Sequence, residues 1–257
     1  MATKQPVSVT RWRADGIEVT ADQLAVETPV ALCYNGICHL VMMLSPQDLD
    51  DFALGFSITE GIIESPQELH QLDFNSSAEG IEINLSIAAR RERGLKQRKR
   101  NLTGRTGCGL CGTDSLQQAI RPVNPVISTE SPSDVAVQQA VAQLDRHQPL
   151  QQLTGAVHGA AWCNLEGEIL CIREDVGRHN ALDKLIGALL CAEVDLSEGF
   201  VLISSRASYE MVHKVAAVGI ANLVAVSAPT ALAIKLAKEA GVNVIAFARE
   251  GSHVRYT

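Results

Sequence analysis

Two cysteines two residues apart, Cys108 and Cys111 in the stretch GRTGCGLCGTD, are the residues of this chain best suited to chemistry. A C-x-x-C pair can bind zinc, cycle between dithiol and disulfide, or carry sulfur. Structural zinc usually needs four ligands, and the chain has no second C-x-x-C, since Cys33 and Cys38 are five residues apart and should lie across a hairpin turn. No histidine is followed two positions later by glutamate, as in a zinc deaminase. We therefore expect no metal.

The surroundings of the pair favour sulfur transfer. Four glycines predict a mobile loop, whereas a thioredoxin-like dithiol sits at the start of a helix. Mobility suits a thiolate that visits two partners. A basic run precedes the loop: Arg90, Arg91, Arg93, Lys96, Arg98, Lys99, Arg100 and Arg105. Nearby cations stabilise a thiolate and attract an acidic partner or an anionic cofactor. The alternatives are that the basic run is only a solvated helix face and that the C-x-x-C loop has no chemistry.

Polar and basic residues also follow four predicted strands, in residues 174–179, 204–208, 227–230 and 247–252. Ligands of open α/β sheets bind at the carboxyl ends of the strands, where helix N-termini favour phosphate. Arg178, Arg206 and Arg249 would add charge-assisted contacts, so we expect a phosphorylated ligand at this edge. None of these four segments contains G-x-G-x-x-G, and the chain has no P-loop motif. The alternative is that the hydroxyl groups here only cap helices: Ser204, Ser208 and Thr230.

The elements that must position these residues fall into two patterns. Before the basic run, Asn35-Gly36 predicts a hairpin in PVALCYNGICHLVMM, and GIEINLSI alternates like a strand. Ser45 as N-cap with Pro46 after it predicts a helix start, and Ser65-Pro66 repeats that signal. This part reads as α+β.

After the linker RPVNPVISTESPSD the pattern becomes α/β. A helix in DVAVQQAVAQLD and two strands in GAVHGAAWCNLEGEILCIRED are followed by a helix in NALDKLIGALLCA. Strands and helices then alternate to VNVIAFA, which predicts a parallel sheet covered on both faces. Cys163 and Cys171 fall on strands, where we expect them to be buried apolar residues. The expected division is an α+β domain at 1–104, the C-x-x-C loop and linker at 105–134, and an α/β domain at 135–257.

Composition limits the class of protein. The chain has 257 residues, of which 46% are hydrophobic and 20% charged, as in ordinary globular proteins. A net charge of −7 argues against nucleic acid as a partner, and no apolar run is long enough to span a membrane. The N-terminus lacks a signal peptide, and seven cysteines are an odd number. We therefore expect a cytoplasmic protein with reduced thiols.

Six motifs together resemble the FdhD family of sulfur carriers for formate dehydrogenase: VALCYNGICH, FALGFSITEGII, GRTGCGLCG, EDVGRHNALDK, SSRASYEMV and FAREGSHVRYT. They extend from about Thr28 to Tyr256. The resemblance implies a sulfurtransferase that takes persulfide sulfur from a cysteine desulfurase. The implied sulfurtransferase passes this sulfur to the molybdenum bis(molybdopterin guanine dinucleotide) cofactor before the cofactor enters formate dehydrogenase. The resemblance also implies a homodimer. It further implies a cytidine-deaminase-like C-terminal domain with a mixed, largely parallel sheet, beside a smaller N-terminal α+β domain.

Transferred by position, the resemblance implies that Cys108 carries the persulfide and that Cys111 assists. It further implies a cofactor-binding loop formed by Phe247, Ala248, Arg249, Glu250, Gly251 and Ser252. Ser252 stands where relatives often have a basic residue. The guanine nucleotide ends of the cofactor imply that guanosine diphosphate can occupy the same crevice. A non-catalytic chaperone of the molybdenum cofactor and a thiol–disulfide oxidoreductase remain the alternative functions.

Overall fold

The computed structural model of the protein describes residues 1–92, 95 and 123–257. Cys108, Cys111 and most of the basic run lie outside the described residues. The described helices are α1 (Leu49–Thr59), α4 (Asp134–Leu144), α5 (Pro149–Thr154), α6 (Arg178–Cys191), α7 (Tyr209–Ala217) and α8 (Ala231–Ala240), with 3₁₀ turns η1 (Pro66–Glu68) and η2 (Asp145–His147). None of these helices is long and apolar enough to cross a membrane.

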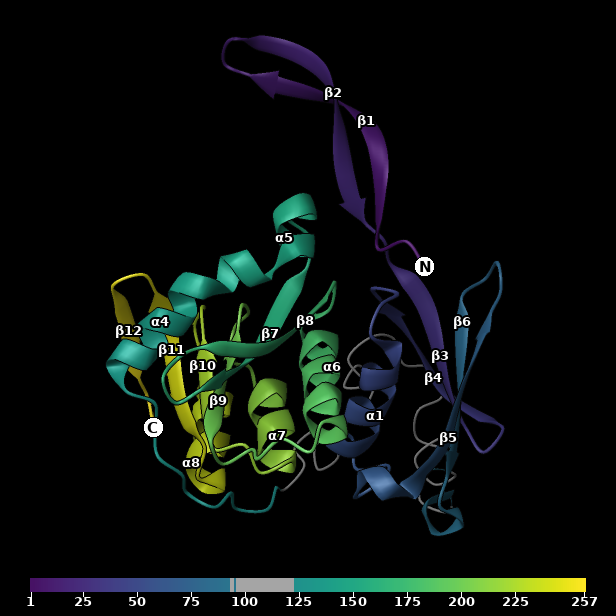
Figure 1. The fold of residues 1–257 in the computed structure, drawn as a ribbon, viewed down its shortest axis with the longest axis vertical. Coiled ribbons are helices and arrows are strands. Elements are labelled where there is room, and N and C mark those ends of the chain that lie inside the picture. The colour runs from purple at the N-terminus through teal and green to yellow at the C-terminus, as the bar shows by residue number, and fades with distance from the viewer. Residues whose placement is uncertain (93–94, 96–122) are drawn as a thin grey trace.

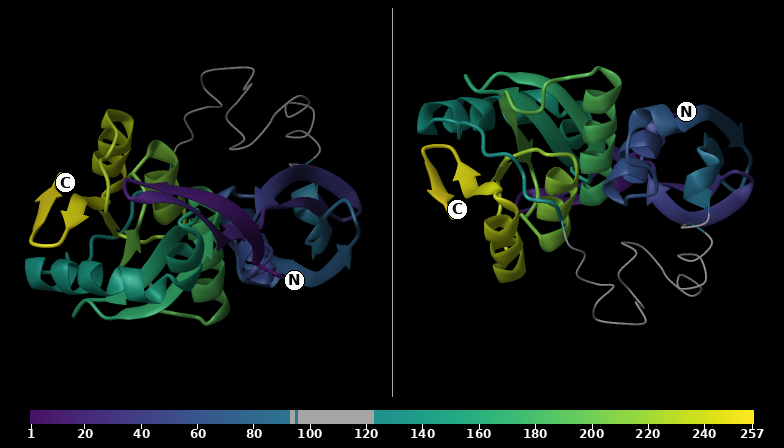
Figure 2. Two further views of the ribbon diagram at one scale, coloured as in Figure 1. Left: turned by 90° about the horizontal axis from the view of Figure 1, so that it is seen from above. Right: turned by 90° about the horizontal axis from the view of Figure 1, so that it is seen from below.

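The strands form three sheets (Figure 1). The first two sheets contain β1 (Lys4–Arg13), β2 (Gly16–Ala25), β3 (Thr28–Tyr34), β4 (Ile37–Leu44), β5 (Leu69–Ser76) and β6 (Ile81–Ile87). The third contains β7 (His158–Asn164), β8 (Ile169–Asp175), β9 (Gly199–Ile203), β10 (Asn222–Ala225), β11 (Asn243–Arg249) and β12 (Ser252–Arg255). Both views in Figure 2 show the β3–β6 sheet and the β7–β12 sheet at opposite ends of the molecule.

The C-terminal sheet confirms the predicted alternation of strands and helices, but the expectation of a largely parallel sheet is wrong, because only two of its five strand pairs are parallel. Its order is β12-β11-β10-β9-β7-β8, and β9, β10 and β11 are parallel while the other pairs are antiparallel. Side chains of a strand alternate between the two faces, so each strand supplies two cores. On one face Val201 and Leu223 pack with α6, α7 and α8. On the other, Phe200 and Leu202 pack against α4.

The N-terminal sheet has the order β4-β3-β6-β5, in which only β3 and β6 are parallel. The predicted hairpin is confirmed, because Asn35 and Gly36 both have positive φ at its turn. Phe52 and Phe56 of α1 pack against this sheet. The structure is therefore a mixed α/β fold, while the domain boundaries at 104 and 134 stay a prediction.

The predicted start of α1 at Ser45 is wrong. The helix begins at Leu49, and Asp48 precedes it in the left-handed conformation, with φ 51° and ψ 41°. Ser45 is buried and contacts the C-terminal part of the chain instead. Its backbone N–H donates to Asp175 Oδ2 at 2.9 Å, and the N–H of Val176 donates to its hydroxyl at 3.2 Å. A tertiary contact has therefore taken over the groups that would have capped the helix.

The N-terminal part, with the β3–β6 sheet, meets the C-terminal part where α1 crosses α6, and glycines permit the crossing. A Cβ atom at Gly55 would lie 1.8 Å from the carbonyl oxygen of Asp183. A Cβ at Gly187 would lie 1.9 Å from the carbonyl oxygen of Asp51. Each helix therefore places backbone against the backbone of the other, and no larger residue fits without separating them.

Residues 4–25 form a two-stranded hairpin that the sequence analysis missed, and it projects from the body of the molecule (Figure 1). One of its faces carries ion pairs of Arg11 and Arg13 with acidic residues of β2. The opposite face carries Trp12, Ile17 and Val19, each at least 70% exposed. Asp15-Gly16 was the available signal, because this dipeptide is typical of hairpin turns.

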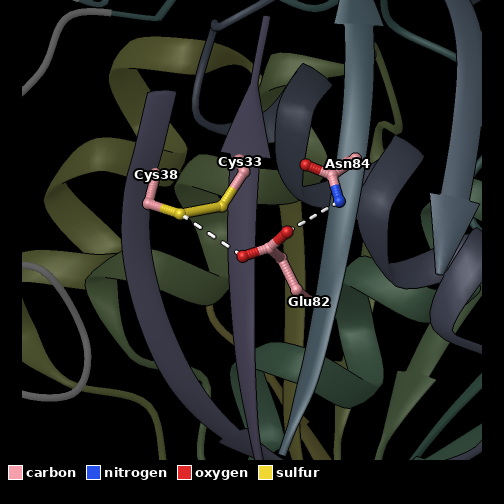
Figure 3. The surroundings of a disulfide bond; sticks show 4 residues. All are labelled: Cys33, Cys38, Glu82 and Asn84. Carbon is pink, nitrogen blue, oxygen red and sulfur yellow. Dashed lines mark hydrogen bonds between the residues drawn. A yellow bond between two sulfur atoms is a disulfide. The ribbon is translucent and has the colours of Figure 1, made fainter. Parts of the chain in front are cut away.

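Cys33 and Cys38 lie opposite one another across the β3–β4 hairpin, as predicted, and their sulfur atoms are bonded in a disulfide (Figure 3). The expectation that all thiols are reduced is therefore wrong for this pair. Cys163 is buried, as expected, but Cys171 is only half-buried.

Candidate functional site

The loops that follow β9, β10 and β11 lie side by side at the carboxyl edge of the C-terminal sheet. The N–H of Ser227 donates to the carbonyl of Ser205 at 3.4 Å, and the N–H of Phe247 donates to the carbonyl of Ser227 at 3.2 Å. Ala207 and Pro229 form an isolated parallel bridge. These contacts extend the sheet beyond its strands and confirm that three of the four predicted segments form one surface.

The fourth segment, residues 174–179, joins this surface through the start of α6. His179 Nε2 lies 3.8 Å from Glu210 Oε2, and the Ser208 hydroxyl donates to the same oxygen at 2.8 Å. On the neighbouring strand, the N–H of Gly159 donates to the Ser204 hydroxyl at 2.9 Å. Segments 174–179 and 204–208 are therefore held together by side chains.

Basic side chains gather at this corner of the sheet edge. Burial, Arg178 and His179 together lower the pKa of His158. The contact with His179 lowers the pKa of Glu210 to about 2, so Glu210 stays ionised. Arg178 Nε and His179 Nε2 are buried and have no hydrogen-bond partner within the described ranges. A buried donor without a partner costs free energy, which a bound anion would offset.

The interpretation of the three hydroxyl residues as helix caps is right for one of them. Thr230 caps α8, because its hydroxyl accepts from the N–H of Ala233 at 3.2 Å. Ser204 and Ser208 contact Gly159 and Glu210 as described above and make no side-chain cap.

The predicted cofactor-binding loop, residues 247–252, does not simply follow the last strand, because β11 continues to Arg249. A bulge interrupts its pairing with β12 between Ala246 and Arg249, and Phe247 within it has φ 51°. Ala248 points into the core. The segment then turns at Glu250 and Gly251, and the N–H of Gly251 donates to Gln138 Oε1 at 2.8 Å.

The exposed members of this loop are available to a ligand. Arg249, Glu250 and Ser252 are exposed, and Phe247 is 39% exposed. Arg206 is also exposed, and neither arginine has an ion-pair partner in the part of the chain that the structure describes. Only Ala248 is turned away, because alternate residues of a strand face opposite sides. Ligand binding by the segment stays a prediction.

The described part of the basic run is already paired. Arg90 and Arg91 both contact Glu68, and Arg91 also contacts Glu64. Arg91, the backbone N–H of Glu64 and Arg90 together lower the pKa of Glu68 to about 2. These two arginines are therefore anchors of the chain, while the other cations of the run, like Cys108 and Cys111, lie outside the described residues.

The motif EDVGRHNALDK contains a buried network that the sequence analysis missed. Asp175 and Lys184, both fully buried, form an ion pair at 2.6 Å, and Lys184 Nζ also donates to the carbonyl of Ser45 at 2.9 Å. Asp183 pairs with buried Lys214 at 2.9 Å. The signal was the Asp183-Lys184 dipeptide within the otherwise apolar stretch of residues 181–191. The motif thus divides into a structural half and the pair Arg178 and His179, which faces the sheet edge.

The chain is similar to known proteins over nearly its whole length. The model of the FdhD/NarQ family matches residues 25–257. The sulfur carrier protein FdhD of Cupriavidus necator is 50% identical over 254 residues, covering 99% of this chain and 88% of that protein. The protein of the same name from Xanthomonas euvesicatoria is 48% identical over 251 residues, covering 97% and 89%.

A solved structure from Desulfotalea psychrophila, assigned as a formate dehydrogenase accessory protein, has a similar fold. The TM-score is 0.76 at 23% sequence identity, over 100% of this chain and 97% of that one. At this identity the likeness speaks for the fold alone. The family model and the two relatives establish more, because each matches nearly the whole sequence. The chain therefore belongs to the FdhD/NarQ family.

Proposed function

We propose that the protein is a sulfurtransferase that carries sulfur from a cysteine desulfurase to the molybdenum bis(molybdopterin guanine dinucleotide) cofactor, before this cofactor enters formate dehydrogenase. The Cys108 thiolate attacks the outer sulfur of the donor persulfide, the donor S–S bond breaks, and the donor thiolate leaves. The products are a Cys108 persulfide and a reduced donor, so no external oxidant is needed. The names of the relatives support sulfur carriage, and the C-x-x-C supplies the thiol.

The carboxyl edge of the C-terminal sheet supports the proposed binding of the cofactor. Four segments converge there, with Arg178, Arg206 and Arg249 among them, and the buried Arg178 Nε makes no hydrogen bond in the described structure. Such an edge suits the phosphates of a guanine nucleotide. The helix-covered parallel strands are also in keeping with a cytidine-deaminase-like domain. The homodimer and the cytoplasmic location remain predictions.

Sulfur loading tests the role of Cys108. After incubation with a cysteine desulfurase and cysteine, the peptide that contains Cys108 should gain the mass of one sulfur atom, which a reductant removes. Cys108→Ala should abolish this gain, while the control Cys191→Ala, which removes an exposed cysteine, should leave it intact. Full loading of the Cys108→Ala protein would show that another residue carries the sulfur.

Nucleotide binding tests the sheet edge. Arg249→Ala should weaken guanosine diphosphate binding by about 10- to 100-fold, the effect of losing one hydrogen bond to a charged group. The matched control Arg146→Ala, an exposed arginine in η2, should bind normally in the same calorimetric titration. Sulfur loading should persist in both variants. Equal affinity of the Arg249→Ala and unsubstituted proteins would remove residues 247–252 from the site, and nucleotide binding without any loading of Cys108 would favour the non-catalytic chaperone.

A further inference from the structure

We propose that Cys33, Cys38 and Glu82, in the dithiol state, form a binding site for a thiophilic divalent cation such as Zn²⁺. The disulfide in the structure is then the closed form of the same site (Figure 3). This site lies on β3, β4 and β6, apart from the sheet edge described above. The proposal does not depend on the proposed function.

Three neighbouring strands place the three ligands together. The β3–β4 register sets Cys33 opposite Cys38, with Cα atoms 3.8 Å apart. The parallel pairing of β3 with β6 brings Glu82 beside them, with Oε2 3.9 Å from Cys38 Sγ. The ligand atoms all lie within 4.8 Å of one another. Tetrahedral zinc with Zn–S near 2.3 Å and Zn–O near 2.1 Å needs ligand atoms about 3.5–3.8 Å apart.

Glu82 is already oriented for this role. Its other oxygen, Oε1, accepts from the side-chain amide of Asn84 at 2.8 Å, and Figure 3 shows Oε2 directed at the sulfur atoms. Outer hydrogen bonds of this kind fix ligands in metal sites. Cys38 is exposed, so an ion can enter from solvent, while Cys33 is buried and fixed by its strand.

The position of Glu82 distinguishes a cation site from a second sulfur-carrying dithiol. A carboxylate beside two thiols disfavours the thiolate that a nucleophile needs. A divalent cation reverses this, because its charge offsets most of that of the two thiolates and the carboxylate, and its binding releases the two thiol protons. A reactive pair would instead need cations nearby.

A purely structural disulfide would add less here than in most places. The bridge closes a loop with a sequence separation of only 5, so it removes less freedom from the unfolded chain than a bridge across a long loop would. The Asn35-Gly36 turn and the burial of β3 between β4 and β6 already fix the register. The chemistry of the pair is therefore a better explanation of the two cysteines than the stability of the hairpin.

The dithiol and disulfide forms interconvert by exchange with a low-molecular-weight disulfide. One cysteine thiolate attacks this disulfide and releases the first small thiol, leaving a mixed disulfide. The other cysteine thiolate then displaces the second small thiol and closes the Cys33–Cys38 bond. Two electrons pass from the protein to the small disulfide, and the cation is released. Three protein ligands leave a fourth position for water.

Cobalt and zinc titrations test the site. The protein is fully reduced, and Cys108→Ala with Cys111→Ala removes the other close dithiol. Co²⁺ should bind one to one with a thiolate-to-cobalt charge-transfer band, and Zn²⁺ should displace it. Cys38→Ser should remove most of the band, and Glu82→Gln should weaken Zn²⁺ binding at least 10-fold. The control Glu79→Gln changes an exposed carboxylate three residues beyond the end of β5 and should bind as the parent does.

Oxidation supplies the second arm. The protein is treated with a small disulfide, and counting of free thiols verifies that the Cys33–Cys38 bond has formed. The oxidised protein should then bind neither Co²⁺ nor Zn²⁺. A reduced protein without stoichiometric binding would overturn the proposal, as would equal binding by the Cys38→Ser or Glu82→Gln variants. Circular dichroism of each variant checks folding, and exposed Cys38 is the safer cysteine to replace than buried Cys33.

Discussion

At the scale of single residues, the three free cysteines that the structure describes differ in burial. Cys163 is enclosed in the core, and burial raises the pKa of its thiol far above the usual value. Cys171 is half-buried, and burial again raises its pKa. Cys191 is exposed at the end of α6. Because the thiolate is the reacting species, these environments predict different reactivities.

Alkylation of the native protein at pH 7.5 (about one unit below the usual thiol pKa) should therefore label Cys191 within minutes, Cys171 more slowly and Cys163 only after unfolding. Mass spectrometry of peptides against time measures the three rates. Cys163 and Cys171 should for the same reason gain no sulfur from a desulfurase. Rapid native labelling of Cys163 would show that its part of the core opens easily.

Glu68 gives a residue-scale prediction about pH. Its pKa is lowered to about 2, so the folded state stabilises its ionised form. The resulting stability is present above the ordinary glutamate pKa and is lost as pH falls through that range towards 2. Glu68→Gln should therefore lower the urea midpoint at pH 7, and the difference from the parent should shrink steadily below pH 4. Glu79→Gln, an exposed glutamate, is the control, and a constant difference across this range would contradict the expected linkage.

At the scale of elements, the β1–β2 hairpin stands apart from the rest of the fold. An isolated pair of strands is marginally stable in water, and of the described helices only α5 makes extensive contact with it. All residues of β9, in contrast, are buried in the centre of a sheet. The two elements should therefore open with very different free energies.

Hydrogen exchange followed by mass spectrometry should show β1 and β2 exchanging within seconds and β9 protected for hours. Dilution of the protein provides the control, because it separates subunits but does not alter contacts within one chain. Protection of β1 and β2 equal to that of β9, and lost on dilution, would show that a second copy covers the exposed Trp12 face.

At the scale of the whole molecule, the joint between the two sheets depends on the α1–α6 crossing and on buried charges. Asp175 reaches across to Ser45, and Lys214 of α7 contacts both Asp183 of α6 and Thr59 of α1. The sheet edge and the N-terminal part are thus held by the same motif, EDVGRHNALDK. A change that separates the helices should disturb both.

Gly187→Ala should do this, because its Cβ would overlap the backbone of α1. We expect a loss of about 1–3 kcal/mol in unfolding free energy, the usual result of overpacking, measured by urea denaturation. Lys238→Ala, on the exposed side of α8, should leave the free energy unchanged. Unchanged stability of the Gly187→Ala protein would show that α1 and α6 can move apart freely.

The sequence by itself determined the features that depend on neighbouring residues. The Asn35-Gly36 hairpin, the strand–helix alternation after residue 198 and the convergence of polar segments at one sheet edge are confirmed, because turns and periodicity are local. The family was also readable from short motifs. The start of α1 was not, since its local capping signal at Ser45 was overridden by Asp175, 130 residues away.

Only the tertiary structure decided which charged and sulfur-containing residues act together. Glu82 joins Cys33 and Cys38 through the parallel pairing of β3 with β6, which no local pattern specifies. Asp175 and Lys184 look like surface residues in the sequence, yet they are the most deeply buried ion pair described. Burial and distance between remote residues arise when the sheets and helices pack, so the chemistry of these groups could not be read from their order in the chain.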